Sequence, residues 1–256
     1  MNVENVGHTV ALIVDDSKPK SNQLLSVEPK KENVITFLKD LKLKDNQRFQ
    51  HIPNINMERN ILYITAPSGQ GKSYYTKQYA DQYRKIYPKR EIYLFSSLTD
   101  DSSIDKIKNL RRIKLSPEFL NEDFSAKDFS ESLIIFDDTD CITDKRMKQK
   151  INGILHSLLE TGRHFSSSVI FTSHIATAGH DTKKILNECH SVTIFCNGMG
   201  GKSKKYLLDQ YLGLDKHQIK RLTRLESRWV TIMKTYPMIC LSEKEAFVLN
   251  SNDEDE

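Results

Sequence analysis

The chain has 256 residues, which suits one α/β domain with extensions, because domains commonly have about 100–200 residues. Hydrophobic residues make up 38% of it, and no run approaches the roughly 18 apolar residues of a membrane-spanning helix, so we expect no membrane span and no signal peptide. A net charge of +4 permits a nucleic-acid partner without indicating one, and four cysteines without C-x-x-C spacing are typical of a reduced, intracellular protein.

Residues 1–59 are expected to form an N-terminal extension and linker. Within them, 10–14 predicts a short strand, the polar stretch 18–31 with two prolines predicts a linker, and 34–43 predicts a short helix. From 60 to 250 strands and helices alternate, which is typical of a mostly parallel sheet flanked by helices. Residues 251–256 are expected to be an acidic, disordered tail.

An apolar strand, 61–65, leads directly into a phosphate-binding loop, which reads Ala66-Pro67-Ser68-Gly69-Gln70-Gly71-Lys72-Ser73, with Tyr74 next. It follows the Walker A pattern G-x-x-x-x-G-K-[ST], except that Ala66 stands at the first glycine. In this motif backbone N–H groups hold phosphates, the lysine reaches the β- and γ-phosphates, and the serine hydroxyl ligates Mg²⁺. The following helix, which is expected to end before Pro88, points its positive end at the same anion. The sequence therefore predicts that ATP and Mg²⁺ bind here.

The helix carries Tyr75, Tyr79 and Tyr83 at four-residue spacing, which favours a packing face. Next we expect a strand at 91–96, a short helix within 100–110, a minor strand at 113–115 and a strand at 133–137.

The strand at 133–137 ends in two aspartates, as a Walker B segment does. Asp137 is the candidate for the Mg²⁺ shell, acting through a bound water. Asp138 is the candidate for orienting the attacking water, one methylene shorter than the glutamate of many ATP hydrolases. Asp140 is a nearby competitor for that role.

A long amphipathic helix is expected at 144–160, followed by a strand at 168–172. Polar residues at the tip of that strand, Thr172, Ser173 and His174, are candidate sensors of the γ-phosphate, and a plain strand-ending turn is the alternative. Arg163 and Arg228 are candidates for an arginine that enters a neighbouring subunit's site, because arginine suits developing phosphate charge. Either arginine could instead form a structural ion pair.

The last part of the chain predicts a strand at 192–196, helical segments within 206–225, and strands at 229–233 and 246–249. Residues 197–205 contain a Gly-Lys-Ser, but Cys196 occupies the required upstream glycine position. A flexible basic hairpin is the better interpretation, and it could line a DNA channel by holding phosphates.

Taken together, these segments resemble the genome-packaging ATPases of large DNA viruses and virophages, of the poxvirus type in the FtsK–HerA superfamily. The resemblance runs from about residue 60 to 249, and it is carried by residues 66–73, 134–138, 162–164, 172–174 and 227–230. The sequence departs from the pattern of the wider superfamily in two places. Position 138 is an aspartate where glutamate is common, and no glutamine ends the 168–172 strand.

The resemblance implies a RecA-like P-loop NTPase domain in a homo-oligomeric ring, a hexamer. Such a ring hydrolyses ATP and drives double-stranded DNA into a capsid, in contact with capsid or portal proteins, and one subunit's arginine completes its neighbour's site. It also implies action in the virus-infected host cell, at virion assembly, or in the virion.

Three other classes share the phosphate loop. A small-molecule kinase normally needs an arginine-bearing lid, for which we find no clear segment. A GTPase is disfavoured because no Asn-Lys-x-Asp or Thr-Lys-x-Asp follows the core strands. A scaffold that binds ATP without hydrolysing it stays open because of Asp138.

Overall fold

The computed structural model describes residues 1–18, 21–28, 34–177 and 180–249. It divides into two compact units, Glu58–Cys189 and a second unit of Met1–Met57 with His190–Glu256. The expected boundaries of extension, ATPase domain and tail stay predictions, and the acidic tail lies outside the described residues. No helix in the described ranges is long and apolar enough to cross a membrane.

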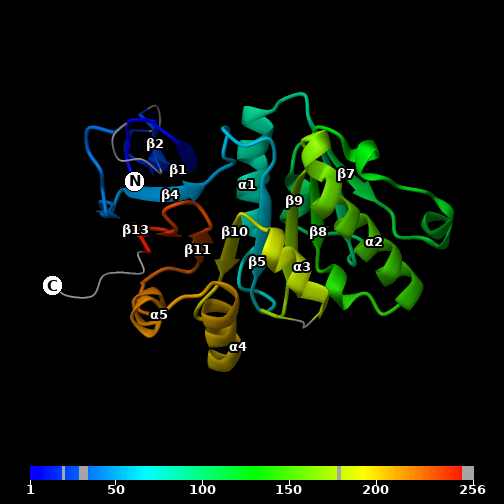
Figure 1. Ribbon diagram of the computed structural model, residues 1–256. Coiled ribbons are helices and arrows are strands. Elements are labelled where there is room, and N and C mark those ends of the chain that lie inside the picture. Colours follow the sequence, from blue (N-terminus) through cyan, green and yellow to red (C-terminus); the bar gives the residue numbers. More distant parts are fainter. Residues whose placement is uncertain (19–20, 29–33, 178–179, 250–256) are drawn as a thin grey trace. The chain divides into compact units, whose positions relative to one another are not determined.

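The unit Glu58–Cys189 contains a five-stranded parallel sheet in the order β5-β9-β8-β6-β7 (Figure 1). The strands are β5 (Ile61–Thr65), β6 (Glu91–Ser96), β7 (Leu110–Ile113), β8 (Ser132–Asp137) and β9 (Ser168–Ser173). Every residue of β5, β8 and β9 is buried, as expected for parallel strands covered on both faces. The α/β, RecA-like fold class is therefore confirmed, and β9 lies between the two strands that carry the Walker segments.

Three α-helices flank this sheet (Figure 1): α1 (Lys72–Ile86), α2 (Lys145–Thr161) and α3 (His180–Glu188). The tyrosine stripe of α1 is buried, which confirms it as a packing face. Helix α2 begins where the Asp144 carboxylate accepts the Met147 N–H at 2.9 Å, an N-cap bond that satisfies a free donor. Short 3₁₀ segments complete the unit: η2 (Ile104–Lys106), η3 (Pro117–Asn121), η4 (Ala126–Phe129), η5 (Thr139–Cys141) and η6 (Gly162–Phe165).

The second unit is built from antiparallel strands. One group pairs in the order β2-β1-β4, with β1 (His8–Asp15), β2 (Gln23–Val27) and β4 (Gln47–His51). The other runs β10-β11-β12-β13-β3, with β3 (Asp40–Lys42), β10 (Ser191–Ile194), β11 (Val230–Met233), β12 (Ile239–Ser242) and β13 (Glu245–Val248). Three helical segments connect β10 to β11: α4 (Gly201–Tyr206), the π-helical η7 (Leu207–Tyr211) and α5 (Lys216–Thr223).

Three local predictions in this unit are wrong. Strand β2 lies inside the expected linker 18–31, because its buried Leu25 and Val27 pair with β1. The second wrong prediction is the helix at 34–43. All ten residues of this range are described, and none of them is helical. There the N–H groups of Ile35 and Thr36 donate to the Glu4 carboxylate, and residues 40–42 pair with β13. The Glu4 carboxylate and sheet pairing thus supply backbone partners that a helix would have supplied.

The third wrong prediction is the flexible hairpin at 197–205. Helix α4 begins there at Gly201, and the N–H of Lys204 donates to the carbonyl of Gly200 at 3.0 Å. Leu207 and Leu208, which begin η7 directly after α4, are fully buried and fix the end of the helix. A short apolar pair after the glycines thus outweighs the turn tendency of Gly200 and Gly201.

Candidate nucleotide-binding site

The phosphate loop connects the buried end of β5 to the start of α1. Gly69 and Gly71 have φ angles of +74° and +109°, a region that glycine enters without steric cost. The N–H of Ala66 donates to the carbonyl of Ser173 at 3.1 Å, so the loop begins in register with β9. Ala66 is fully buried, and its φ is not positive, so this position does not require the conformational freedom of the usual first glycine.

Lys72 is the centre of a polar cluster at the carboxyl ends of β5, β8 and β9. Its ammonium Nζ donates to the Ala66 carbonyl at 3.0 Å and lies 3.0 Å from Nδ1 of His174. Its Nζ is also 3.6 Å from Oδ1 of Asp138. Only 6% of the lysine side chain is exposed. The cation is therefore held at the loop by groups of its own chain, from residues far apart in the sequence.

The two Walker B aspartates share one hydroxyl. Oγ1 of Thr172 lies 2.9 Å from Oδ1 of Asp137 and 3.3 Å from Oδ1 of Asp138, and it accepts the Asp138 N–H at 3.1 Å. Burial, and next the neighbouring Asp138 charge, raise the pKa of Asp137 to about 6. The tip of β9 is thus bonded directly to the acidic tip of β8.

Asp138 has the left-handed conformation, with φ at +50°. Such a backbone is uncommon for residues other than glycine, although aspartate and asparagine accept it best. The turn directs the Asp138 side chain toward Lys72 and His174. Nε2 of His174 lies 2.8 Å from Oδ2 of Asp138. Asp140 contacts the Ser173 hydroxyl and the His174 backbone. Among the described residues it forms no hydrogen bond or ion pair with Lys72.

The donor set fits a magnesium ion. Hydroxyl and carboxylate oxygens are hard ligands of the kind that Mg²⁺ takes, together with substrate phosphates and water. Asp137 is 1% exposed and supplies such an oxygen, and Ser73 opens α1 next to Lys72. A bound cation would also offset the repulsion between the two adjacent carboxylates. That Ser73 and Asp137 hold the ion stays a prediction.

Arg163 does not belong to this cluster. It lies in η6, before the amino end of β9, whereas Thr172 lies at the carboxyl end of the same strand. Its Nε donates to Oε2 of Glu58 at 2.8 Å, and both side chains are largely exposed, at 73% and 60%. The guanidinium is thus exposed and forms an ion pair, which was the alternative interpretation, and a role in a neighbouring subunit's site stays a prediction.

Arg228 lies in the second unit, just before β11. Its side chain is exposed and forms no hydrogen bond or ion pair with the described residues. Its backbone N–H donates to Oε2 of Glu243 at 3.0 Å. The flanking Ser227 is buried and donates to the Trp229 carbonyl at 2.6 Å. The Ser-Arg-Trp segment therefore has a local structural role in joining α5 to β11. A catalytic role for Arg228 stays a prediction.

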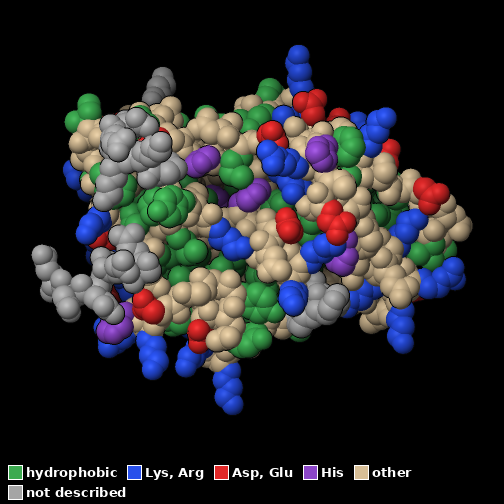
Figure 2. Space-filling model, viewed as in Figure 1, with side chains coloured by type: hydrophobic (Ala, Val, Ile, Leu, Met, Phe, Trp, Pro, Cys, Tyr) green, Lys and Arg blue, Asp and Glu red, His purple; other side chains and the backbone are tan. Residues whose placement is uncertain are grey.

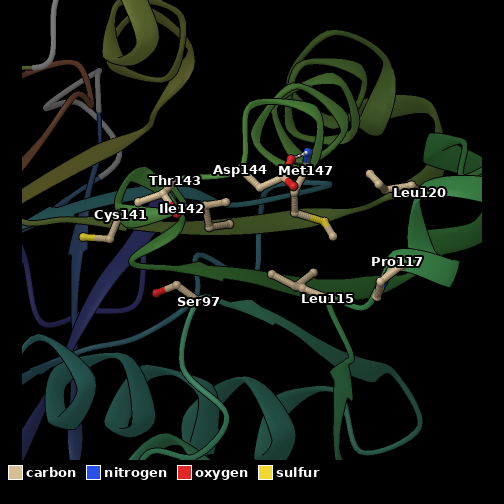
Figure 3. Close-up of a pocket in the computed structure, with 9 residues that line it drawn as sticks. All are labelled: Ser97, Leu115, Pro117, Leu120, Cys141, Ile142, Thr143, Asp144 and Met147. Atoms are coloured by element: carbon tan, nitrogen blue, oxygen red, sulfur yellow. Dashed lines mark hydrogen bonds between the residues drawn. The ribbon is translucent and has the colours of Figure 1, made fainter.

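A pocket of about 480 Å³ lies beside η5, lined by residues that follow β6, β7 and β8 (Figure 3). Its lining residues are Ser97, Leu115, Pro117, Leu120, Cys141, Ile142, Thr143, Asp144 and Met147. Figure 3 shows Leu115 and Met147 directed toward each other from opposite sides of the space. None of the residues that we predicted for the site lines this pocket.

Sequence reasoning did not single out Tyr63. This tyrosine lies in the middle of β5, and its hydroxyl is 2.9 Å from the Ile175 carbonyl and 3.1 Å from the Ala176 carbonyl. Because a buried hydroxyl needs a partner, a tyrosine between Leu62 and Ile64 in a buried strand was the available signal. The identity of the partner depends on the position of β9 next to β5, which the sequence does not state.

A glycine loop joins a buried strand to a helix, and a second buried strand, which ends in aspartates, lies two positions away in the same parallel sheet. Together these features define a P-loop NTPase with a RecA-like fold. Comparison with solved structures agrees. The DNA-packaging ATPase B204 of Sulfolobus turreted icosahedral virus superimposes with a TM-score of 0.53, at 15% identity, over 73% of this chain and 98% of that one. The cytoplasmic domain of the type VII secretion ATPase EccC of Thermomonospora curvata gives 0.54, at 9% identity, over 90% of this chain and 31% of that one.

Comparison of sequences gives a closer relationship. Protein V3 of Sputnik virophage, which is uncharacterised, is 37% identical over 206 residues, covering 79% of this chain and 82% of that protein. No family model matches the chain. The chain belongs to the virophage protein family that contains V3, and its fold is similar to that of the packaging ATPase B204.

Proposed function

We propose that this protein is an ATP-hydrolysing motor that moves double-stranded DNA into a viral capsid. The observation that carries the proposal is the position of Lys72 within hydrogen-bond or ion-pair distance of His174 and Asp138, at the tips of three adjacent strands. A γ-phosphate bound by the loop would meet a cation, an acidic group and a polar strand tip at one place. The likeness in fold to a DNA-packaging ATPase supports the same direction.

In this proposal the loop 66–74 binds the triphosphate, and Ser73 and Asp137 hold Mg²⁺, which would offset charge on the phosphates. Asp138 orients the attacking water, and Thr172 and His174 contact the γ-phosphate. Arg163 completes the site of the next subunit in a homo-oligomeric ring, which we expect to be a hexamer. Such a ring would act in the infected cell, where it would meet capsid or portal proteins.

Basic side chains of α4 and α5 offer a surface for DNA. Figure 2 shows Lys and Arg side chains projecting over the region where Figure 1 places these two helices. The exposed members are Lys202 and Lys205 of α4, Lys216, Lys220 and Arg221 of α5, and Arg224 directly after α5. Lysine and arginine on such a surface bind phosphates without reading sequence, which is what a packaging motor needs.

The test is ATP hydrolysis by the full chain, with and without long double-stranded DNA, across a salt series. We expect DNA to stimulate turnover and the stimulation to fall as salt rises, because counterions compete for the phosphate backbone. Turnover that ignores DNA would leave an NTPase of another class, and screening of small-molecule phosphate acceptors would then test the kinase alternative. Absence of any turnover with retained ATP binding would favour the non-hydrolysing scaffold.

A further inference from the structure

We propose that Asp140 is a positioning residue, which holds the loop after β9 so that the imidazole of His174 bridges Lys72 and Asp138. The inference rests on the proposed function for its kinetic consequences. Its structural part concerns only how the side chain of His174 is oriented, and that part can be measured without turnover.

The carboxylate of Asp140 contacts two consecutive residues at the end of β9. Its Oδ2 accepts the Ser173 hydroxyl at 2.7 Å and the His174 N–H at 3.3 Å. Asp140 belongs to η5, which directly follows the Walker B strand β8. One side chain therefore links the turn after β8 to the turn after β9.

The same loop is held from the opposite side by β5. The Tyr63 hydroxyl lies within 3.1 Å of the carbonyls of Ile175 and Ala176, and the Ser173 hydroxyl accepts the Ile175 N–H at 3.1 Å. Two residues separate Tyr63 from the first residue of the phosphate loop, Ala66. The backbone that carries His174 is thus anchored both to the strand of the phosphate loop and to the turn of the Walker B strand.

The contacts of the His174 ring determine its tautomer. A lysine ammonium only donates, so Nδ1, at 3.0 Å from Nζ of Lys72, must accept. The ring proton is then on Nε2, which donates to Oδ2 of Asp138 at 2.8 Å. Both contacts need the ring in one orientation. Loss of the Asp140 bonds would release the His174 N–H and the Ser173 hydroxyl, and the ring would no longer be held between the two groups.

The kinetic test compares Asp140→Ala with the wild-type chain. We expect kcat for ATP to fall about 10- to 100-fold while KM changes less than about threefold, because a small misplacement acts on the transition state more than on binding. Asp140→Asn should recover much of the rate, since its amide oxygen accepts from the same donors. Asp123→Ala removes an acid whose side chain is fully exposed and serves as the matched control, with unchanged rates expected.

A double-mutant cycle separates positioning from a general structural effect. If Asp140 acts through His174, the variant Asp140→Ala/His174→Ala should be no slower than His174→Ala alone. If the double variant instead shows the product of the two single kcat losses, the residues act independently and the proposal is overturned. Should Asp140→Ala fail to fold, Ser173→Ala removes the bridging hydroxyl and should give the same pattern with His174→Ala.

The imidazole ¹⁵N chemical shifts of His174 give a readout that does not depend on activity. We expect a single Nε2–H tautomer in the wild-type chain and a mixture of tautomers in Asp140→Ala. The same single tautomer in both proteins would overturn the inference even if both hydrolyse ATP. A wild-type chain that does not hydrolyse ATP yet shows this difference would contradict the proposed function and keep the positioning role.

Discussion

Nζ of Lys72 lies 3.0 Å from Nδ1 of His174, although 102 residues separate them in the chain. The contact exists because β9 pairs in parallel with β5, which brings the end of one strand beside the loop that leaves the other. The lysine is thus bound to groups of its own chain. A phosphate that enters the loop would have to compete with these groups for the ammonium.

Lys72→Ala should abolish ATP hydrolysis, with a loss of at least about 100-fold, because the loop loses the charge that stabilises the transferring phosphoryl group. The measurement is steady-state phosphate release. Lys77→Ala, which changes a lysine of the same helix that pairs with Asp81, is the matched control and should keep its rate. Undiminished turnover in Lys72→Ala would remove the basis of the site assignment.

Asp138→Asn should bind ATP normally but hydrolyse it about 100-fold more slowly or worse, because loss of the carboxylate removes the group that orients water. Asparagine accepts the left-handed backbone of this position, so the turn should persist. Retention of unhydrolysed ATP after gel filtration is the measurement. Turnover at the wild-type rate would show that another group positions the water.

Arg163→Ala should be inactive on its own. In mixed rings with Lys72→Ala it should recover part of the activity, because the Lys72→Ala subunit supplies the arginine and the Arg163→Ala subunit supplies the intact phosphate loop. The Arg163–Glu58 ion pair is exposed, so we expect no measurable change in Tm. Glu58→Ala, which removes only the partner of the pair, is the control and should stay active. A lack of rescue at every mixing ratio would argue for a role within one subunit.

Asp137→Asn should stabilise the nucleotide-free protein at pH 7.5 but not at pH 3.5. The pKa of Asp137 is raised to about 6 in the folded state from its ordinary 3.8, so the folded state holds the proton more tightly. The associated stability is fully present below about pH 3.8 and is lost as the pH rises through about 6. The loss at neutral pH is at most about 3 kcal/mol, at about 1.4 kcal/mol per pH unit.

Urea unfolding without Mg²⁺ at the two pH values measures this effect. Asparagine cannot ionise, and its amide oxygen still accepts the Thr172 hydroxyl, so the gain should appear only where Asp137 is charged. Asp123→Asn is the exposed control and should leave both values unchanged. An equal effect of Asp137→Asn at both pH values would show that packing, not charge, is responsible.

Lys202→Ala/Lys205→Ala should weaken DNA binding and lower the DNA-stimulated rate while leaving basal hydrolysis unchanged. Each lysine that contacts a phosphate adds about 0.9 to the slope of log K against log salt, so the double variant should reduce the slope by up to about 2. Fluorescence anisotropy with labelled duplex DNA across a salt series measures it. Lys106→Ala/Lys108→Ala, two exposed lysines of the other unit, is the control. A slope equal to that of the wild-type chain would place DNA elsewhere.

The parallel, P-loop half of the protein could be predicted from sequence because its signals are local. Glycines before Lys72, an apolar run ending in Asp137 and Asp138, and the capped helix after Asp144 each depend on neighbours within a few residues. The structure has these elements within a few residues of the expected limits. The antiparallel unit was predicted less well, since β2 and β3 are short and stabilised by partners distant in the chain.

The sequence by itself determined which groups are available: a loop that can surround phosphates, a lysine, two adjacent carboxylates and a polar strand tip. Only the tertiary structure decided which of them meet. Placing β9 between β5 and β8 brings Thr172 to both aspartates, His174 to Lys72 and Asp140 to Ser173, and it leaves Arg163 at the opposite end of the strand. Strand order depends on the burial of whole strand faces and on backbone pairing across the sheet, and neither is encoded within any short segment.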